Sequence, residues 1–182
     1  MKRPLTAAIL AAGLYLAAGS QAWAQTKLDH RQQIEQVVET FRTSIINKDK
    51  DSFMKLFLRD NITWSAAFTD ASVERRHARV RAKDPSRPAP PKTFNSNPRE
   101  FIEDIAGDPA HLEETFSNVR IDTDGDVAQV WFDYSFMVGN YKQNSGKEAW
   151  HLLRTESGWK IASVIWSMET NPEPPPPPKP KA

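Results

Sequence analysis

The sequence predicts an α+β domain in which helices cover one face of a curved, largely antiparallel sheet. Apolar residues recur at helical spacing in the first half of the chain, and strand-like segments fill the second half. Asp124-Gly125, a strong hairpin signal, joins the first two of those segments. Helices followed by a run of strands are typical of α+β domains.

Three amphipathic helices are expected. The first has apolar residues at i, i+3, i+4, i+7 and i+11, which form one buried stripe: Ile34, Val37, Val38, Phe41 and Ile45. A second, short helix carries Phe53, Leu56 and Phe57. A third begins at Asn97-Pro98, because Asn is a good N-cap and Pro suits the first helical position; its stripe is Phe101, Ile102 and Ile105.

Five strands are expected, at 61–69, 115–122, 126–138, 147–156 and 159–168. Period-2 alternation places Ile62, Trp64, Ala66 and Phe68 on one face of the first strand. Residues 70–97 show no periodicity, contain seven Arg or Lys residues between Val73 and Lys92, and are rich in proline. They predict a long basic, Pro-rich loop, which is either a solvated excursion, a lid or a contact for an anionic partner.

The chain ends predict an exported protein with an extended tail. Residues 1–24 have the basic start, apolar run and small-x-small site of a secretory signal peptide, with cleavage after Ala24. We therefore expect a periplasmic or secreted domain over 25–170, and no membrane association after cleavage. The absence of cysteine excludes a lipoprotein and disulfides. Residues 171–182 predict a disordered polyproline tail.

Several segments together resemble the nuclear transport factor 2-like superfamily, which includes SnoaL-like proteins and ketosteroid isomerase. They are the opening helix, ITW at 62–64, PREFIEDIA at 98–106, DTDGDVAQVWFDYSF at 122–136 and GWKIASVIWS at 158–167. The resemblance covers about residues 31–168. It implies a cone-shaped curved sheet wrapped around the N-terminal helices, a pocket in its mouth, and often a sheet-to-sheet dimer. It does not specify a reaction.

A charge pair suggests the register of the sheet. Asp133 opposite Arg154 would place Phe136 opposite His151 and Tyr134 opposite Leu153. A turn at 156–158 would in addition place His151 opposite Ser163, and together the two pairings assign two faces. The pocket face predicts a ligand-binding set: Trp64, Phe68, Phe101, Ile105, Phe132, Tyr134, Phe136, His151 and Ser163. The outer face predicts a homodimer surface: Trp131, Trp150, Leu152, Val164 and Trp166. A one-residue slip would exchange the faces.

Specific chemistry is hard to assign. His151 and Tyr134 are weak candidates for general acid–base catalysis. For His151, a hydrogen-bonded core histidine is the favoured interpretation, ahead of a ligand-orienting role. No carboxylate base accompanies them in this register. DTDGD at 122–126 fails the spacing of a calcium loop and predicts a turn. We expect no metal site and no cofactor. Removal of Lys2 and Arg3 with the signal peptide changes the formal charge from +1 to −1, and such a near-neutral domain predicts no nucleic-acid partner.

The sequence thus favours an exported domain that binds an unidentified small apolar or aromatic molecule in an aromatic-lined pocket, without catalysis. Two alternatives remain open. One is an isomerase, cyclase or dehydratase that uses His151 and Tyr134, and the other is a dimeric interaction module.

Overall fold

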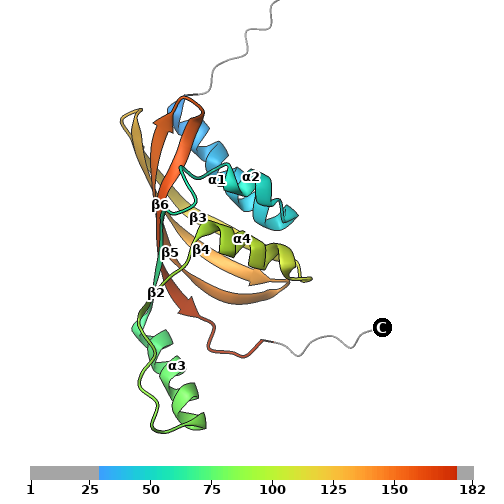
Figure 1. Ribbon diagram of the computed structural model, residues 1–182, viewed down its shortest axis with the longest axis vertical. Helices are drawn as coiled ribbons and strands as arrows, with labels where there is room; N and C mark the ends of the chain where they lie inside the picture. The colour runs from blue at the N-terminus through green and yellow to red at the C-terminus, as the bar shows by residue number, and fades with distance from the viewer. Residues whose placement is uncertain (1–28, 176–182) are drawn as a thin grey trace, which may run out of the picture.

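The computed structural model describes residues 29–175, so the predicted signal peptide and the end of the proline tail lie outside the described part. Four helices are present in this part: α1 (His30–Asn47), α2 (Lys50–Met54), α3 (Asp70–Lys83) and α4 (Pro98–Gly107). In Figure 1, α1, α2 and α4 lie on one side of the curved sheet, while α3 projects from one end. No helix within residues 29–175 has the length and apolar character needed to cross a membrane.

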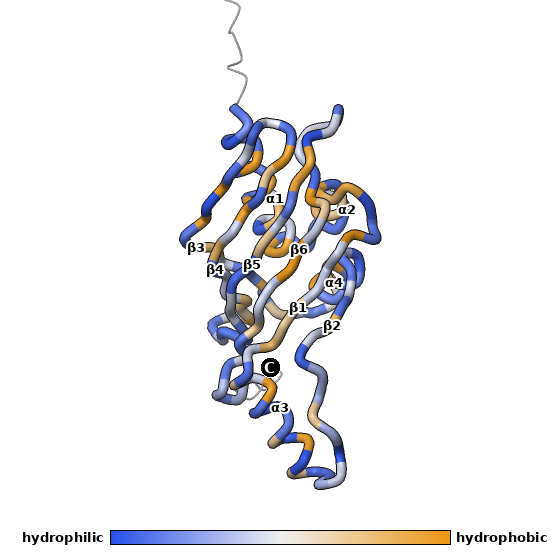
Figure 2. Tube along the Cα trace, turned by 90° about the vertical axis from the view of Figure 1, so that its left-hand side faces the viewer, coloured by the Kyte–Doolittle hydropathy of each residue, from blue (hydrophilic) through white to orange (hydrophobic). Residues whose placement is uncertain are grey.

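The sheet contains β1 (Thr63–Phe68), β2 (Thr93–Asn95), β3 (Leu112–Thr123), β4 (Val127–Val138), β5 (Tyr141–Thr155) and β6 (Gly158–Thr170). Their order is β2-β1-β6-β5-β4-β3, which Figure 2 shows from the face opposite the helices. Strands β3 to β6 form an antiparallel meander, and only β1 and β6 run parallel. The predicted α+β class, with a curved, unclosed sheet against the N-terminal helices, is confirmed.

The predicted helical stripes form the core. Ile34, Phe41 and Ile45 of α1 are almost completely buried, as are Phe53 and Ile102. Asn97 caps α4, since its side chain accepts a hydrogen bond from the backbone N–H of Glu100 at 2.9 Å. The alternating face of β1 is buried as predicted, and the turn between β3 and β4 falls at 124–126. Local patterns therefore identified most of the elements.

The predicted register between β4 and β5 is wrong. Asp133 pairs with Lys147, not Arg154, and Arg154 binds Asp126 at the neighbouring turn. This is a shift of seven residues along β5. Because the shift is an odd number, every side chain of β5 lies on the opposite face from the predicted one. Trp150 and Leu152 are therefore inside, and His151 and Leu153 are outside.

Strand β6 changes face along its length. Trp159 and Ile161 are inside, but further along Val164 is inside and Ile165 is 45% exposed. The register shifts by one residue between the pairs Leu152–Ile161 and His151–Ser163, so β6 carries one extra residue there. The predicted pairing of His151 with Ser163 is nevertheless confirmed.

The predicted loop at 70–97 is wrong for most of its length, because residues 70–83 form α3 and residues 93–95 form β2. The Thr69 side chain caps α3 by accepting from the backbone N–H of Ser72. Most of the side chains of α3 are exposed or partly exposed, and only Ser72 is buried. A helix that buries so little has no apolar stripe, which is why the sequence pattern did not reveal it.

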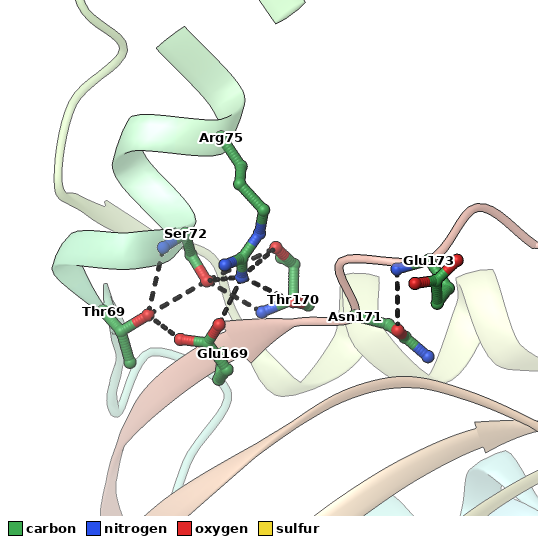
Figure 3. A network of polar contacts seen from close by, with 7 residues as sticks. All are labelled: Thr69, Ser72, Arg75, Glu169, Thr170, Asn171 and Glu173. Atoms are coloured by element: carbon green, nitrogen blue, oxygen red, sulfur yellow. Dashed lines mark hydrogen bonds and ion pairs between the residues drawn. The ribbon is translucent and has the colours of Figure 1, made fainter. Parts of the chain in front are cut away.

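Polar contacts join the first turns of α3 to the end of β6 (Figure 3). The buried Ser72 hydroxyl accepts hydrogen bonds from the backbone N–H of Thr170 at 2.9 Å and from the Arg75 guanidinium at 3.1 Å. Arg75 also donates to the Thr170 carbonyl at 2.7 Å and pairs with Glu169. Hydrogen bonds from Thr69 and Arg75 lower the pKa of Glu169. The helix is thus held by polar anchors at one end.

A glycine is required where β5 passes β6. A Cβ atom at Gly146 would lie 2.0 Å from the carbonyl oxygen of Ser167, which is closer than any real contact. We predict that Gly146→Ala destabilises the domain by about 3 kcal/mol or more, because the two strands must separate. Thermal unfolding followed by circular dichroism measures this. Gly107→Ala is the matched control, since a Cβ there meets nothing within 4 Å; equal melting temperatures for the two variants would contradict the prediction.

Candidate functional site

A cavity of about 250 Å³ lies between the helices and the concave face of the sheet. All six strands, α1 and α4 contribute to its wall. The lining residues are Phe41, Trp64, Phe94, Ser96, Phe101, Asp104, Glu114, Tyr134, Phe136, Gln143, Asn144, Glu148, Val164, Trp166 and Met168. A cavity of about 150 Å³ can hold benzene, so this one has room for a substituted ring.

Aromatic rings form the apolar part of the wall. The Trp64 ring lies 5.4 Å from the Phe101 ring and 5.5 Å from the Trp166 ring, measured between centroids. The rings of Phe41 and Trp64 are stacked at 6.5 Å. These rings come from α1, β1, α4 and β6, so the fold as a whole positions them. They offer faces and edges to an apolar or aromatic ligand.

Two buried carboxyl groups face each other in the same wall. Glu114 of β3 and Glu148 of β5 are 5% and 4% exposed and are hydrogen-bonded to each other. The Trp150 indole N–H also donates to Glu148 Oε1 at 2.5 Å. Glu148 is the only partner of the Glu114 side chain among residues 29–175. The second oxygen of Glu114 is therefore free to meet a ligand.

Burial raises the pKa values of both acids. Loss of solvent raises the pKa of Glu148 to about 7, although its hydrogen bonds with Trp150 and Glu114 act in the opposite direction. Burial and the neighbouring Glu148 raise the pKa of Glu114 well above its ordinary value. The pair therefore retains a proton near neutral pH, and Glu114 donates to the Glu148 carboxylate. Such a pair can bind a cation, donate a hydrogen bond or exchange a proton.

The hydroxyl of Tyr134 lies beside this pair but already has an acceptor. It donates to the carbonyl oxygen of Ser167 at 3.0 Å. Burial, followed by the two glutamates, raises the pKa of Tyr134, so it stays protonated. Its single proton is committed to the backbone of β6 rather than to the cavity.

Four of the nine predicted ligand-binding residues line the cavity: Trp64, Phe101, Tyr134 and Phe136. Three others, Phe68, Ile105 and Phe132, are buried in the core but do not line it. The remaining two, His151 and Ser163, lie on the outer face, where His151 Nδ1 and Ser163 Oγ are 2.8 Å apart. Their predicted place in the pocket is wrong. His151 lies outside because β5 has the other register with β4, and Ser163 lies outside because β6 changes face at its extra residue.

The predicted dimer surface requires the same correction. Trp150, Leu152 and Val164 are almost completely buried in the core, and Trp166 lines the cavity. Only Trp131 lies on the outer face, where it is 41% exposed. The apolar residues exposed on the same face of β5 and β6 are ones that the predicted faces had placed inside: Leu153 and Ile165.

The sequence reasoning missed both glutamates. A signal for them exists, since Leu112, Glu114 and Phe116 alternate along β3, and Glu148, Trp150 and Leu152 alternate along β5. A carboxyl group in phase with large apolar residues is carried to the buried face with them. The incorrect register hid this signal on β5. Within residues 29–175, no group of three His, Cys, Asp or Glu residues is arranged to hold a metal ion.

Comparison with solved structures identifies the fold. An NTF2-like protein with a cystatin-like fold from Novosphingobium aromaticivorans superposes with a TM-score of 0.52 and 11% identity, covering 76% of this chain and 81% of the other. An NTF2-like protein of unknown function from Pseudomonas putida gives 0.51 and 11%, covering 78% and 88%. A protein of unknown function from Mycobacterium tuberculosis gives 0.51 and 14%, covering 76% of each chain.

The chain therefore has the nuclear transport factor 2-like, cystatin-like fold, as the sequence resemblance implied. No protein-family model matches the chain, and no curated protein matches it in sequence. At such low identity the structural likeness concerns the fold alone, so function has to be argued from the cavity.

The carboxyl pair makes stability depend on pH. Because the folded pKa of Glu148 is about 7 and its unfolded pKa is near 4.5, the folded state holds the extra proton between these values. The free energy of unfolding should therefore fall as pH rises through this window, by about 3 kcal/mol for a single group. We predict that Glu148→Gln flattens this decrease and is more stable than the wild type at pH 8. Urea unfolding at pH 5 and pH 8 measures the difference.

Glu113→Gln is the control, since Glu113 is adjacent in sequence but forms a partly exposed pair with Arg42. It should retain the pH dependence of the wild type. A wild-type stability that is constant between pH 5 and pH 8 would show that the pair does not titrate there.

Proposed function

We propose that this domain binds a small, ring-bearing molecule in the cavity of the cone, without catalysis. The observation that carries the proposal is the cavity itself, in which aromatic rings from four elements enclose a space next to two buried carboxyl groups. Ligand sites in proteins are mostly apolar and contain a few polar groups that orient the ligand. The sequence pattern of residues 1–24 supports the further proposal that the domain acts outside the cytoplasm.

An enzymatic role is the second candidate, and the carboxyl pair is the observation in its favour. The pairing of His151 with Tyr134 no longer supports it, because these side chains lie on opposite faces of the sheet. An acid with a pKa of about 7 is well matched to proton transfer near neutrality. Exchange of the α-protons of cyclohexanone with D₂O, catalysed by the protein and lost in Glu148→Gln, would favour this candidate over binding alone.

Binding in the cavity can be blocked selectively. Asn144 of β5 lines the cavity, whereas its neighbour Ser145 lies in the opposite phase of the strand. We predict that benzyl alcohol binds the protein with a dissociation constant on the order of 1 mM, and that Asn144→Trp weakens this binding at least about ten-fold by filling the space. Ligand-observed NMR gives the affinities. Ser145→Trp, the control, should bind like the wild type.

Equal affinity of benzyl alcohol for Asn144→Trp and the wild type would place the binding elsewhere and contradict the proposal. Native mass spectrometry of protein purified from its own host is the complementary measurement. A retained small molecule that is absent from Asn144→Trp would support the proposal and give the mass of the ligand.

We also propose that two copies associate through the outer face of the sheet. Support comes from apolar side chains exposed on adjacent strands of that face, since Trp131, Leu153 and Ile165 are each 38–45% exposed. Apolar patches of this kind often mark association surfaces. The alternative function as an interaction module, in which the domain assembles with a second protein, would use the same surface.

A charge placed on this face should prevent the association. We predict that Ile165→Lys converts a dimer to a monomer in sizing chromatography with light scattering, because each subunit would bury a lysine against apolar residues. Val119→Lys is the control, because Val119 is similarly exposed but lies where the pairing of β3 with β4 is interrupted. A wild-type protein that stays monomeric at high concentration would overturn the proposal.

A further inference from the structure

The cavity contains acidic groups and no basic ones. Its titratable lining groups are Asp104, Glu114, Tyr134 and Glu148, and none of the lining residues is Lys, Arg or His. Asp104 is exposed on α4, while the two glutamates are buried deeper in the wall. The described part of the chain thus supplies no cation to balance the carboxyl pair. A charge buried without a counter-charge is unfavourable, so the site is electrostatically incomplete.

Glu114 is the clearest sign of a missing partner. It is buried to more than nine-tenths and lines the cavity, yet its only partner among residues 29–175 is another acid. Glu148, by contrast, also accepts from the Trp150 indole. Buried carboxyl oxygens in proteins are almost always hydrogen-bonded by donors. A ligand that brings a donor with a positive charge would satisfy both glutamates at once.

The rest of the wall suits a cation as well. The Trp64 ring contacts two other rings of the wall. Its centroid lies 5.4 Å from that of Phe101 and 5.5 Å from that of Trp166. The negative face of an aromatic ring attracts an ammonium group, and Trp is the strongest such partner. Rings and carboxylates in one small cavity are the combination by which proteins recognise amines and quaternary ammonium groups. An anionic ligand would meet repulsion from the same groups.

We propose that the cavity is built for a small organic cation, a protonated amine on a ring or short apolar skeleton, held between the Glu114–Glu148 pair and the surrounding aromatic rings. This inference rests on the proposed binding function and adds the class of ligand. The ammonium group donates to the free oxygen of Glu114 and to Glu148, and the apolar skeleton contacts Trp64 and Trp166. Binding of the cation expels the shared proton, because the carboxylates become ionised around it.

Two probes of matched shape test the charge. Benzylamine and benzyl alcohol share a ring and a methylene group and differ in the terminal ammonium or hydroxyl. Titration calorimetry of protein produced from the full chain gives the affinity of each at pH 6 and pH 8. We expect benzylamine to bind at least about ten-fold more tightly than benzyl alcohol at pH 8, and the ratio to fall at pH 6, where Glu148 gains a proton.

Proton release gives a readout that a merely structural role would not produce. Benzylamine binding at pH 6.5 should release protons, so its measured enthalpy should differ between buffers of high and low ionisation enthalpy. Benzyl alcohol should show no such difference. Glu114→Gln and Glu148→Gln, tested separately so that either can replace the other if one fails to fold, should each reduce the preference for the amine. Glu113→Gln, the matched control outside the cavity, should keep it.

The outcomes separate the two proposals. A preference below two-fold, or one that persists in both glutamine variants, overturns the cation inference and leaves the binding function in place. If neither probe binds at any pH, the cation inference and the proposed binding function both fall. Binding of benzylamine that is equally strong in Asn144→Trp would place the cation outside the cavity and overturn the inference.

Discussion

The register of β5 between β4 and β6 is the constraint on which the site depends. Asp133 opposite Lys147 places Trp150 and Leu152 under the helices, where both are almost completely buried. Side chains alternate along a strand, so the same register carries Glu148 to the buried face and His151 to the outer face. In a register shifted by one residue, Glu148 would lie on the outer face and His151 on the buried face. Burial of the largest apolar residues of β5 thus also determines which of its polar side chains lies in the site.

Burying two acids weakens the fold, and the structure offsets this only in part. The Trp150 indole supports Glu148, and a shared proton removes one of the two charges. No described cation approaches the pair within the cavity wall. Replacing buried ionisable pairs with apolar residues of similar volume is often neutral or stabilising. Leucine at 114 and 148 would therefore serve folding at least as well in many such cases, which is consistent with the proposed ligand role of the polar pair.

The sequence predicted the elements better than their pairing. Alternation in β4 correctly placed Phe132 and Tyr134 inside, and helical periodicity correctly identified the buried stripe of α1. The register was wrong because it was chosen from one charge pair, which contributes little at an exposed position. Both residues form ion pairs with other partners: Asp133 pairs with Lys147, and Arg154 pairs with Asp126. Burial of Trp150 and Leu152 is worth several times more, and that comparison would have favoured the true register.

Other features depend on residues far apart in the sequence, so local patterns predicted them poorly or not at all. The helix α3 is anchored by hydrogen bonds between Ser72 or Arg75 and residues 169–170, nearly 100 positions away in the sequence. The extra residue that changes the face of β6 arises from its pairing with β5. The sequence of residues 161–164 alone therefore does not predict this change of face. The glutamates were partly predictable, since each alternates with large apolar residues. Their pairing was not, because β3 and β5 are brought together only by β4 between them.

The close approach of β5 to β6 also decides which group a ligand meets. Gly146 lets the Ser167 carbonyl lie against β5, and that carbonyl accepts the Tyr134 hydroxyl proton. The phenol, whose pKa is raised by burial, is therefore held as a donor to the backbone. A phenol that donates to a ligand oxygen would define a site for developing negative charge. Here the proton is already engaged, so the ionisable groups left to meet a ligand in the cavity wall are the carboxyl groups of Asp104, Glu114 and Glu148. The electrostatics of the site therefore favour positive charge instead.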